Sequence, residues 1–220
     1  MQIDIEKIKN AQHILIITDS ASFANASALY SAILTLHKKV SLQNTESLDV
    51  KLSFLPWFEK SRTNRPSTAD YLIEVNIDTL ELYNFLTQNS FKINQKIATA
   101  LYAGLLNRYD NFLSSDCDST IFALVGKLIG YNTQKQLCHE FLLQRVPLAH
   151  MRLKERLLKS LVLKDDAKHA LVSICDDDLR SSNTQLSDAC IIIKEFLTIV
   201  HVEKVTLLKS DENNKIIKEI

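Results

Sequence analysis

The 220-residue chain contains only three glycines, Gly104, Gly126 and Gly130. Phosphate-binding loops of the G-x-G-x-x-G and G-x-x-x-x-G-K types need glycine, because their backbone must approach the phosphate closely. None of the three glycines lies in such an arrangement, so the sequence excludes a nucleotide-binding Rossmann or P-loop enzyme. Gly104 lies among alanines, which predicts the close approach of a helix to its neighbour, and Gly130 suits the end of a helix.

Close cysteine pairs, an excess of one charge and long apolar runs are also absent. The four cysteines lack the C-x-x-C spacing of structural zinc sites. Lysine plus arginine equals aspartate plus glutamate at 26 each, so no global field favours nucleic acid or an anionic membrane. No apolar run approaches the roughly 20 residues that span a bilayer. The first residues also mix acids into the segment that a secretion signal would keep apolar. We therefore expect a cytoplasmic protein that does not associate with membranes.

Short apolar runs alternate with amphipathic stretches in the first two thirds of the chain. Residues 14–18 are rich in β-branched side chains and predict a strand buried in a parallel sheet. A helix follows, with Leu29, Ala32, Ile33 and Leu36 on one face. Further strands are predicted at residues 40–42 and 71–75. Further helices are predicted at residues 79–86, 94–106, 119–129 and 133–143.

Pro147 marks a boundary, because proline interrupts regular structure. The next segment, residues 148–161, predicts an amphipathic helix whose apolar side carries Met151, Leu157, Leu158 and Leu161. Two strands and a helix are expected after it, at residues 169–174, 205–208 and 188–200. The sequence thus predicts an α/β protein with two lobes. Residues 1–146 form a lobe built on a parallel sheet, and residues 147–220 form a small α/β lobe that includes the connecting helix.

The loop after the first strand is where a functional site is expected, because open α/β sheets bind ligands at the carboxyl ends of their strands. This loop, residues 19–25, has one carboxylate, Asp19, and no glycine, histidine or lysine. The loop where a site is expected therefore has few side chains suited to catalysis or to metal binding.

Three stretches of the chain resemble motifs of a known family. Residues 97–106 resemble the helix that leads to the third metal motif of the DHH phosphoesterases. Residues 144–153 resemble the junction between the catalytic and DHH-associated domains, and residues 14–40 occupy the place of the first motif. The chain therefore resembles the DHH phosphoesterase superfamily. The resemblance is to the bacterial nanoRNase and oligoribonuclease type, which also removes phosphate from phosphoadenosine phosphate. It implies a site in which Asp and His side chains hold two divalent cations, usually manganese.

The residues at the matching positions differ from the metal ligands of the family. Asp19 and Asn25 correspond to the histidine and the second aspartate of the first motif, and Asp78 corresponds to the aspartate of the second motif. The namesake Asp-His-His run is absent, because no two histidines are adjacent. In the third motif Arg108 takes the place of the aspartate, and Asp110 follows it. An arginine at this position puts a permanent positive charge where a cation would be bound.

Two functions follow from the resemblance. The altered motifs predict a shortened, non-catalytic DHH-like protein without a bound metal. It would act by binding or assembly, as a homodimer, with another protein, or with a nucleotide or short oligonucleotide that it does not cleave. The alternative is an active manganese-dependent phosphoesterase that uses Asp19, Asp78 and Asp110 and acts on short oligonucleotides or phosphoadenosine phosphate. We expect Arg108 to pair with Asp19 or Asp78, and we expect the helices at residues 94–106 and 119–129 to form the dimer interface.

A small basic segment offers a second place for a ligand. Arg62 and Arg65, with Lys60, lie near Trp57 and Phe58 in the sequence. Cations mixed with aromatic rings suit a single-stranded oligonucleotide, whose bases stack while its phosphates pair with the cations. The alternative is a solvated loop beside packed aromatic side chains.

Overall fold

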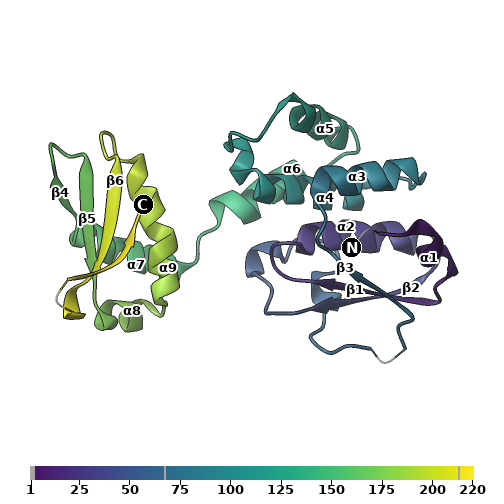
Figure 1. The fold of residues 1–220 in the computed structure, drawn as a ribbon, viewed down its shortest axis with the longest axis horizontal. Helices are drawn as coiled ribbons and strands as arrows, with labels where there is room; N and C mark the ends of the chain where they lie inside the picture. Colours follow the sequence, from purple (N-terminus) through teal and green to yellow (C-terminus); the bar gives the residue numbers. More distant parts are fainter. Residues whose placement is uncertain (1–2, 67, 213) are drawn as a thin grey trace. The chain divides into compact units, whose positions relative to one another are not determined.

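The chain folds into two compact units, residues 1–145 and 146–220, each with its own hydrophobic core (Figure 1). This computed structural model describes residues 3–66, 68–212 and 214–220. Both units combine helices with a sheet, so the predicted α/β class is confirmed. In the described parts of the chain, no helix has both the length and the apolarity required to cross a membrane.

The first unit is built on a three-stranded parallel sheet. Its strands are β1 (His13–Thr18), β2 (Lys39–Asn44) and β3 (Tyr71–Glu74), in the order β2-β1-β3. Ile14 of the central strand lies opposite Val40 on one side and Tyr71 on the other. The apolar run of β1 is almost entirely buried, which explains why the sequence shows no alternation of polar and apolar residues here.

Two helices cover one face of this sheet in successive layers. Figure 1 shows α2 (Phe23–Leu34) between the sheet and α4 (Gln95–Arg108). Every residue of α2 from Phe23 to Ile33 is buried, because the helix has neighbours on several sides. Leu29, Ala32 and Ile33 are buried as their spacing predicts, whereas Leu36 lies beyond the end of the helix.

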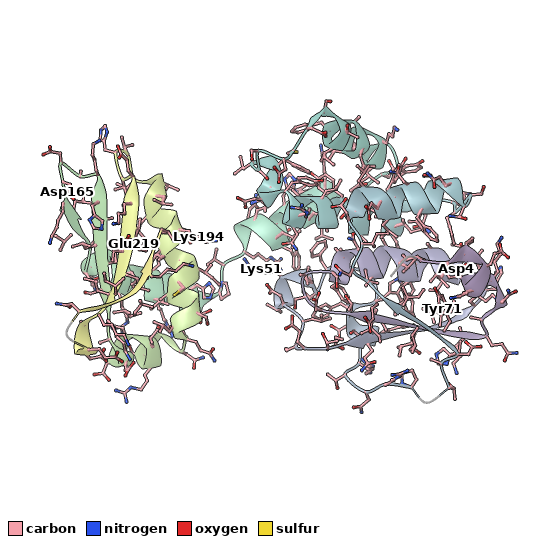
Figure 2. The ribbon with its side chains drawn as sticks, in the orientation of Figure 1. Asp4, Lys51, Tyr71, Asp165, Lys194 and Glu219 are labelled. Atoms are coloured by element: carbon pink, nitrogen blue, oxygen red, sulfur yellow. The ribbon has the colours of Figure 1, made fainter. Side chains whose placement is uncertain are left out.

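The remaining helices of the first unit complete its core. They are α1 (Ile5–Asn10), α3 (Thr79–Gln88), α5 (Ser119–Ile129) and α6 (Lys135–His139), with α6 continuing into a wider turn at Glu140–Gln144. Three short 3-10 segments lie at Val50–Leu52, Phe58–Lys60 and Asp110–Phe112. Asp4 caps α1, and its backbone N–H donates to the hydroxyl of Tyr71 over 3.4 Å, which ties α1 to β3 (Figure 2).

The second unit carries a mixed four-stranded sheet. Its strands are β4 (Val162–Lys164), β5 (His169–Ile174), β6 (Lys204–Lys209) and β7 (Lys215–Glu219). They lie in the order β4-β5-β6-β7, with the central pair parallel and both outer pairs antiparallel. The helices are α7 (Leu148–Lys159), α8 (Asp176–Ser182) and α9 (Leu186–Ile192), and short 3-10 segments lie at Ile193–Thr198 and Ser210–Glu212.

The predicted connecting helix is α7, and it packs into the second unit. Leu153 and Leu157 are fully buried in the core of that unit, whereas Met151 and Leu158 are 53% and 47% exposed. The prediction that Met151 and Leu158 form the apolar side was therefore wrong. Leu153 and Leu157 are four residues apart, so they share a narrow stripe that faces the sheet.

Gly104 lets α4 approach two other elements of the first unit. A Cβ atom at this position would lie 2.7 Å from Oδ1 of Asn25 and 2.8 Å from Oγ1 of Thr79. The close approach predicted from the alanine-rich sequence is therefore confirmed. Gly130 ends α5 as expected, but its φ of −61° is right-handed, so the backbone there does not require glycine.

Two glycine substitutions are expected to have opposite effects on stability. Gly104→Ala should lower the free energy of unfolding of the first unit by about 1–3 kcal/mol, because the added methyl group forces Asn25 and Thr79 apart. Gly126→Ala, the matched control, should raise it by about 0.5–1 kcal/mol, because nothing lies near that position and alanine favours helix. Urea titration followed by fluorescence of Trp57, the single tryptophan, measures both. Equal stability of the two variants would contradict the packing described here.

Candidate functional site at the carboxyl end of the sheet

The carboxyl ends of β1 and β3 open onto a cavity of about 720 Å³ in the first unit. The loop after β1, the loop after β3 and the last turn of α4 form its walls, so three separate segments meet there. Four of the five residues predicted for the site line this cavity: Asp19, Asn25, Asp78 and Arg108. We call this cavity the sheet-end cleft.

Asp19 is held by its own loop. Its Oδ1 accepts hydrogen bonds from the backbone N–H of Ser22 over 2.8 Å and from the Ser22 hydroxyl over 2.6 Å. These hydrogen bonds lower the pKa of Asp19 below its ordinary value, so the carboxylate is ionised at neutral pH. Asp19 therefore brings a negative charge to the cleft, but one of its two oxygens already has two donors.

Asn25 connects α2 to the loop after β3. Its Nδ2 donates to the carbonyl of Ile77 over 2.9 Å, and its Oδ1 accepts from the Thr79 hydroxyl over 3.0 Å. Asn25 and Thr79 are both buried. The nitrogen and the oxygen of the Asn25 amide are thus both hydrogen-bonded, and these bonds hold the walls of the cleft together.

Asp78 and Arg108 form an ion pair at the rim of the cleft. Oδ1 of Asp78 accepts from the backbone N–H of Leu80 over 2.8 Å and so caps α3, whereas Oδ2 lies 3.7 Å from Nε of Arg108. The side chains are 30% and 57% exposed, so solvent weakens the pair. The pairing of Arg108 with Asp78 that the sequence predicts is present in the structure.

Asp110 lies outside the sheet-end cleft. It lines a neighbouring hollow of about 450 Å³ together with Lys51. A left-handed turn follows α4, with φ values of 44°, 60° and 66° at Asp110, Asn111 and Phe112. This turn separates Asp110 from Asp19 and Asp78, so the structure does not assemble the predicted set of three carboxylates in one cavity.

The donors of the sheet-end cleft do not fit a two-metal centre. Such a centre needs several carboxylate or imidazole ligands that converge on two cations. Here Asp19 and Asp78 each have an oxygen engaged by backbone N–H groups, and the guanidinium of Arg108 lies beside Asp78. Within residues 3–66, 68–212 and 214–220, no group of three or more His, Cys, Asp or Glu is placed to hold a metal ion.

Sequence reasoning missed two residues that shape the cleft. Ser22 fixes the carboxylate of Asp19, and Thr79 fixes the amide of Asn25. The spacing of Asp19 and Ser22 is typical of a polar side chain that closes a turn on a following backbone N–H, so a local signal for this pair existed. Thr79 is far from Asn25 in the sequence, and no local pattern connects them.

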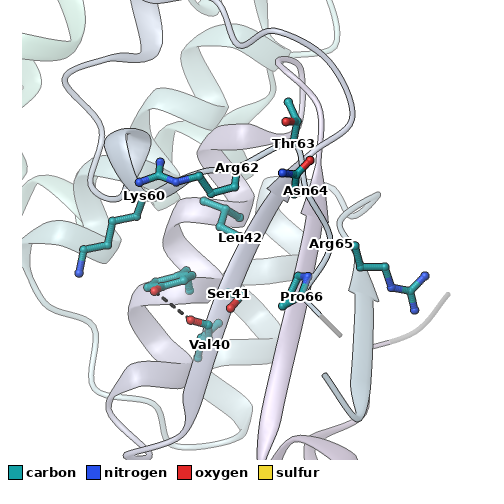
Figure 3. A pocket seen from close by; sticks show the side chains of 10 residues that line it. Val40, Ser41, Leu42, Lys60, Arg62, Thr63, Asn64, Arg65 and Pro66 are labelled. Carbon is teal, nitrogen blue, oxygen red and sulfur yellow. Dashed lines mark hydrogen bonds between the residues drawn. The ribbon is translucent and has the colours of Figure 1, made fainter. Parts of the chain in front are cut away.

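Arg62 and Arg65 belong to a different part of the first unit. They line a hollow of about 580 Å³ beside β2, together with Tyr30 and Lys60 (Figure 3). The backbone of Arg62 extends the free edge of β2, because its N–H donates to Leu42 over 3.0 Å. The structure therefore separates the two predicted ligand-contacting arginines from the sheet-end cleft.

Comparisons with known proteins identify the fold. No protein-family model matches the sequence, and no curated protein matches it significantly. Among solved structures, an exopolyphosphatase-related protein from Bacteroides fragilis matches with a TM-score of 0.74 and 12% identity, over 95% of this chain and 79% of that chain.

Two further matches have TM-scores below 0.5 and therefore do not establish a shared fold. A putative family II inorganic pyrophosphatase from Methanococcus jannaschii has a TM-score of 0.34 and 12% identity, over 90% of this chain and 83% of that chain. The exonuclease RecJ bound to manganese has a TM-score of 0.37 and 10% identity, over 93% of this chain and 77% of that chain.

The match to the exopolyphosphatase-related protein defines the class of fold. The chain shares its α/β fold with that protein over both of its units, and an α/β fold with two lobes is what the sequence predicts. At 12% identity the match shows the fold alone, and a shared fold does not establish a shared activity.

Reversing the charge of Arg108 tests the ion pair at the cleft. Arg108→Asp should lower the free energy of unfolding of the first unit by up to about 1 kcal/mol, because it replaces attraction to Asp78 with repulsion. Arg108→Gln, which removes the charge without reversing it, should have a smaller effect. Urea titrations of both variants in low salt and in 1 M NaCl check this, and the difference should shrink in high salt. An Arg108→Asp variant as stable as the parent protein would place Arg108 away from Asp78.

Proposed function

We propose that this protein is a non-catalytic member of the DHH-fold class that acts by binding or assembly rather than by hydrolysing phosphoesters. One observation carries the proposal: the ion pair of Arg108 with Asp78 at the rim of the sheet-end cleft. The sequence resemblance places Arg108 where the family has a metal-binding aspartate.

The ion pair has a direct electrostatic consequence. A divalent cation at Asp78 would lie close to the guanidinium of Arg108, and like charges at short distance repel strongly. Arginine keeps its charge at all accessible pH values, so deprotonation does not relieve the repulsion. The hydrogen bonds of Asp19 and Asn25 also occupy oxygens that a cation would need. The cleft is therefore better suited to holding its own loops in place than to binding two metal ions.

An active manganese-dependent phosphoesterase is the second candidate. It is supported by Asp19, whose lowered pKa keeps a carboxylate ionised at the cleft. This candidate requires Asp19 to bind a cation through its remaining oxygen, with ligands other than Asp110 completing the site.

Hydrolysis assays separate the two candidates. The full chain, incubated with manganese and either dinucleotides or phosphoadenosine phosphate, should release no more product than it does without metal. Asp19→Ala should behave identically, because the proposal gives Asp19 no catalytic role. The electron paramagnetic resonance signal of free Mn²⁺ should also be unchanged by the protein. Metal-dependent turnover that disappears in Asp19→Ala would reject the non-catalytic proposal.

We further propose that the protein assembles as a homodimer through the outer face of α5. The sequence predicts both α4 and α5 at the interface, but Ile97 to Leu106 of α4 are all buried, so α4 has no free surface there. On α5, Phe122 and Ile129 are 54% and 42% exposed, and open space surrounds Gly126. A solvent-facing helix surface that is mostly apolar is typical of an interface.

Charge favours a second copy as the partner of α5. Asp118 lies at the start of the helix, and Lys127 lies in its last turn. A twofold axis that pairs α5 with the same helix of another copy in antiparallel orientation brings each acidic end near a basic end. Isologous contacts of this kind are the commonest solution among homo-oligomers.

Light scattering at micromolar concentrations tests the dimer. The parent protein should have twice the mass of the 25.0 kDa chain, and Phe122→Glu should have the mass of one chain, because it buries a charge in the apolar contact. Val50→Glu, at another exposed apolar residue of the first unit, is the matched control and should leave the dimer intact. A parent protein that stays monomeric across a tenfold range of concentration would reject homodimerisation.

A further inference from the structure

A second concave surface of the first unit lies apart from the sheet-end cleft. Two hollows, of about 580 Å³ and 350 Å³, are lined by Tyr30 and by Trp57 respectively. The ring centroids of these two residues are 4.9 Å apart, so both hollows lie beside the same pair of packed rings. We call this surface the basic–aromatic groove, and its defining side chains are Tyr30, Trp57, Lys60, Arg62, Arg65 and Lys96. Of the residues that the structure describes, no aspartate or glutamate lines either hollow, although the whole chain has no net charge.

Trp57 is held in a fixed orientation in the groove. Its φ of 73° is left-handed, which is rare for a bulky residue and persists only where the surroundings impose it. The indole N–H donates to the hydroxyl of Ser31 over 2.7 Å, and Tyr30 packs against the ring. The side chain nevertheless stays partly exposed. The protein therefore presents a rigid aromatic surface beside open space.

Two lysines flank this ring. Nζ of Lys60 lies 5.2 Å from the ring centroid of Trp57, and Nζ of Lys96 lies 5.1 Å from it. Among the described residues, neither lysine forms a salt bridge with an acid. The attraction of a cation to the indole face holds each ammonium group near the ring. Both positive charges therefore remain available to an anion next to the ring.

The two arginines have different roles. Nη1 of Arg62 donates to the backbone carbonyls of Glu59 and Ser61 over 2.6 Å and 2.8 Å, so it stabilises the loop. Figure 3 shows Arg65 on the far side of the hollow from Lys60, with its guanidinium pointing outward. Positive charge is thus spread along the groove rather than concentrated at one point, which suits a chain of phosphates better than a single phosphate.

We propose that the basic–aromatic groove binds single-stranded nucleic acid, with a base stacked on Trp57 and the phosphates paired with Lys60, Lys96 and Arg65. An aromatic platform flanked by cations is the usual means of binding single strands without sequence preference. A paired base does not present its face to the ring, so a duplex would bind only through the attraction of its phosphates to the cations. The proposal is independent of whether the sheet-end cleft hydrolyses a substrate, because no residue of that cleft lines the groove.

Fluorescence measurements on the full chain test the proposal. A labelled oligothymidylate or oligouridylate should bind with an increase in anisotropy and should quench the emission of Trp57, which is the single tryptophan and so reports only this site. Plotted against the logarithm of the salt concentration, the logarithm of the binding constant should fall with a slope of roughly −2, as expected when about three phosphates are neutralised. The matching duplex and inorganic polyphosphate should bind more weakly and leave the emission of Trp57 unquenched.

Variants locate the binding site. Lys60→Gln combined with Lys96→Gln should weaken binding about tenfold and flatten the salt dependence. Lys7→Gln, at an exposed lysine on α1, removes the same kind of charge and should have no effect. Trp57→Ala should weaken binding about tenfold and Trp57→Phe less, with circular dichroism confirming that both variants are folded. Glu59→Gln should strengthen binding slightly, because it removes an exposed acid from the same segment.

The following results would contradict the proposal that the groove binds single-stranded nucleic acid. Oligonucleotide binding that leaves the emission of Trp57 unchanged, or that survives the double lysine substitution, would overturn the assignment to this groove. Equal affinity for polyphosphate and for the single strand would overturn the stacking role of Trp57. Failure to bind any oligonucleotide, with or without binding to anionic phospholipid vesicles, would overturn the proposal. Loss of binding in Asp19→Ala would place the ligand in the sheet-end cleft instead.

Discussion

The contact between Asn25, Thr79 and Gly104 holds the first unit together. It joins α2, the start of α3 and α4 at one buried point, and only a residue without a side chain leaves room for it. A second hydrogen bond from Asn25 to the carbonyl of Ile77 fixes the loop after β3. Because this loop and the end of α4 carry Asp78 and Arg108, the same contact sets the geometry of the sheet-end cleft.

Satisfying these buried polar groups has a chemical consequence. A buried amide or hydroxyl must be hydrogen-bonded, because leaving it unpaired costs a large part of the stability of a domain. In the cleft, the partners come from the protein itself: Ser22 for Asp19, Thr79 for Asn25, and the cap of α3 together with Arg108 for Asp78. Oxygens that complete the fold in this way are poor candidates for metal ligands. The arrangement that stabilises the loops thus also explains why we favour binding over hydrolysis.

The cleft and the basic–aromatic groove differ in how their charged side chains are paired. In the cleft, Arg108 lies beside Asp78, so much of the charge is neutralised internally. In the groove, Lys60 and Lys96 lie near an aromatic ring rather than near a carboxylate. A cation that is held in place but not neutralised interacts more strongly with an incoming anion, because no internal partner has to be displaced. The groove therefore offers an anionic ligand more unpaired positive charge than the sheet-end cleft does.

The sequence by itself determined the class of fold and most of its elements, because strands β1 and β5 and helices α4 and α5 carry local apolar patterns. It did not indicate β4, whose residues are all exposed, or the buried stripe of Leu153 on α7. Four of the five residues predicted for a site line one cavity, whereas Asp110 lies outside it, in a left-handed turn. Only the tertiary structure decided that Thr79 bonds Asn25 and that Lys96 reaches the ring of Trp57. Local patterns report which side chains are buried, but contacts between distant segments depend on how the whole chain packs.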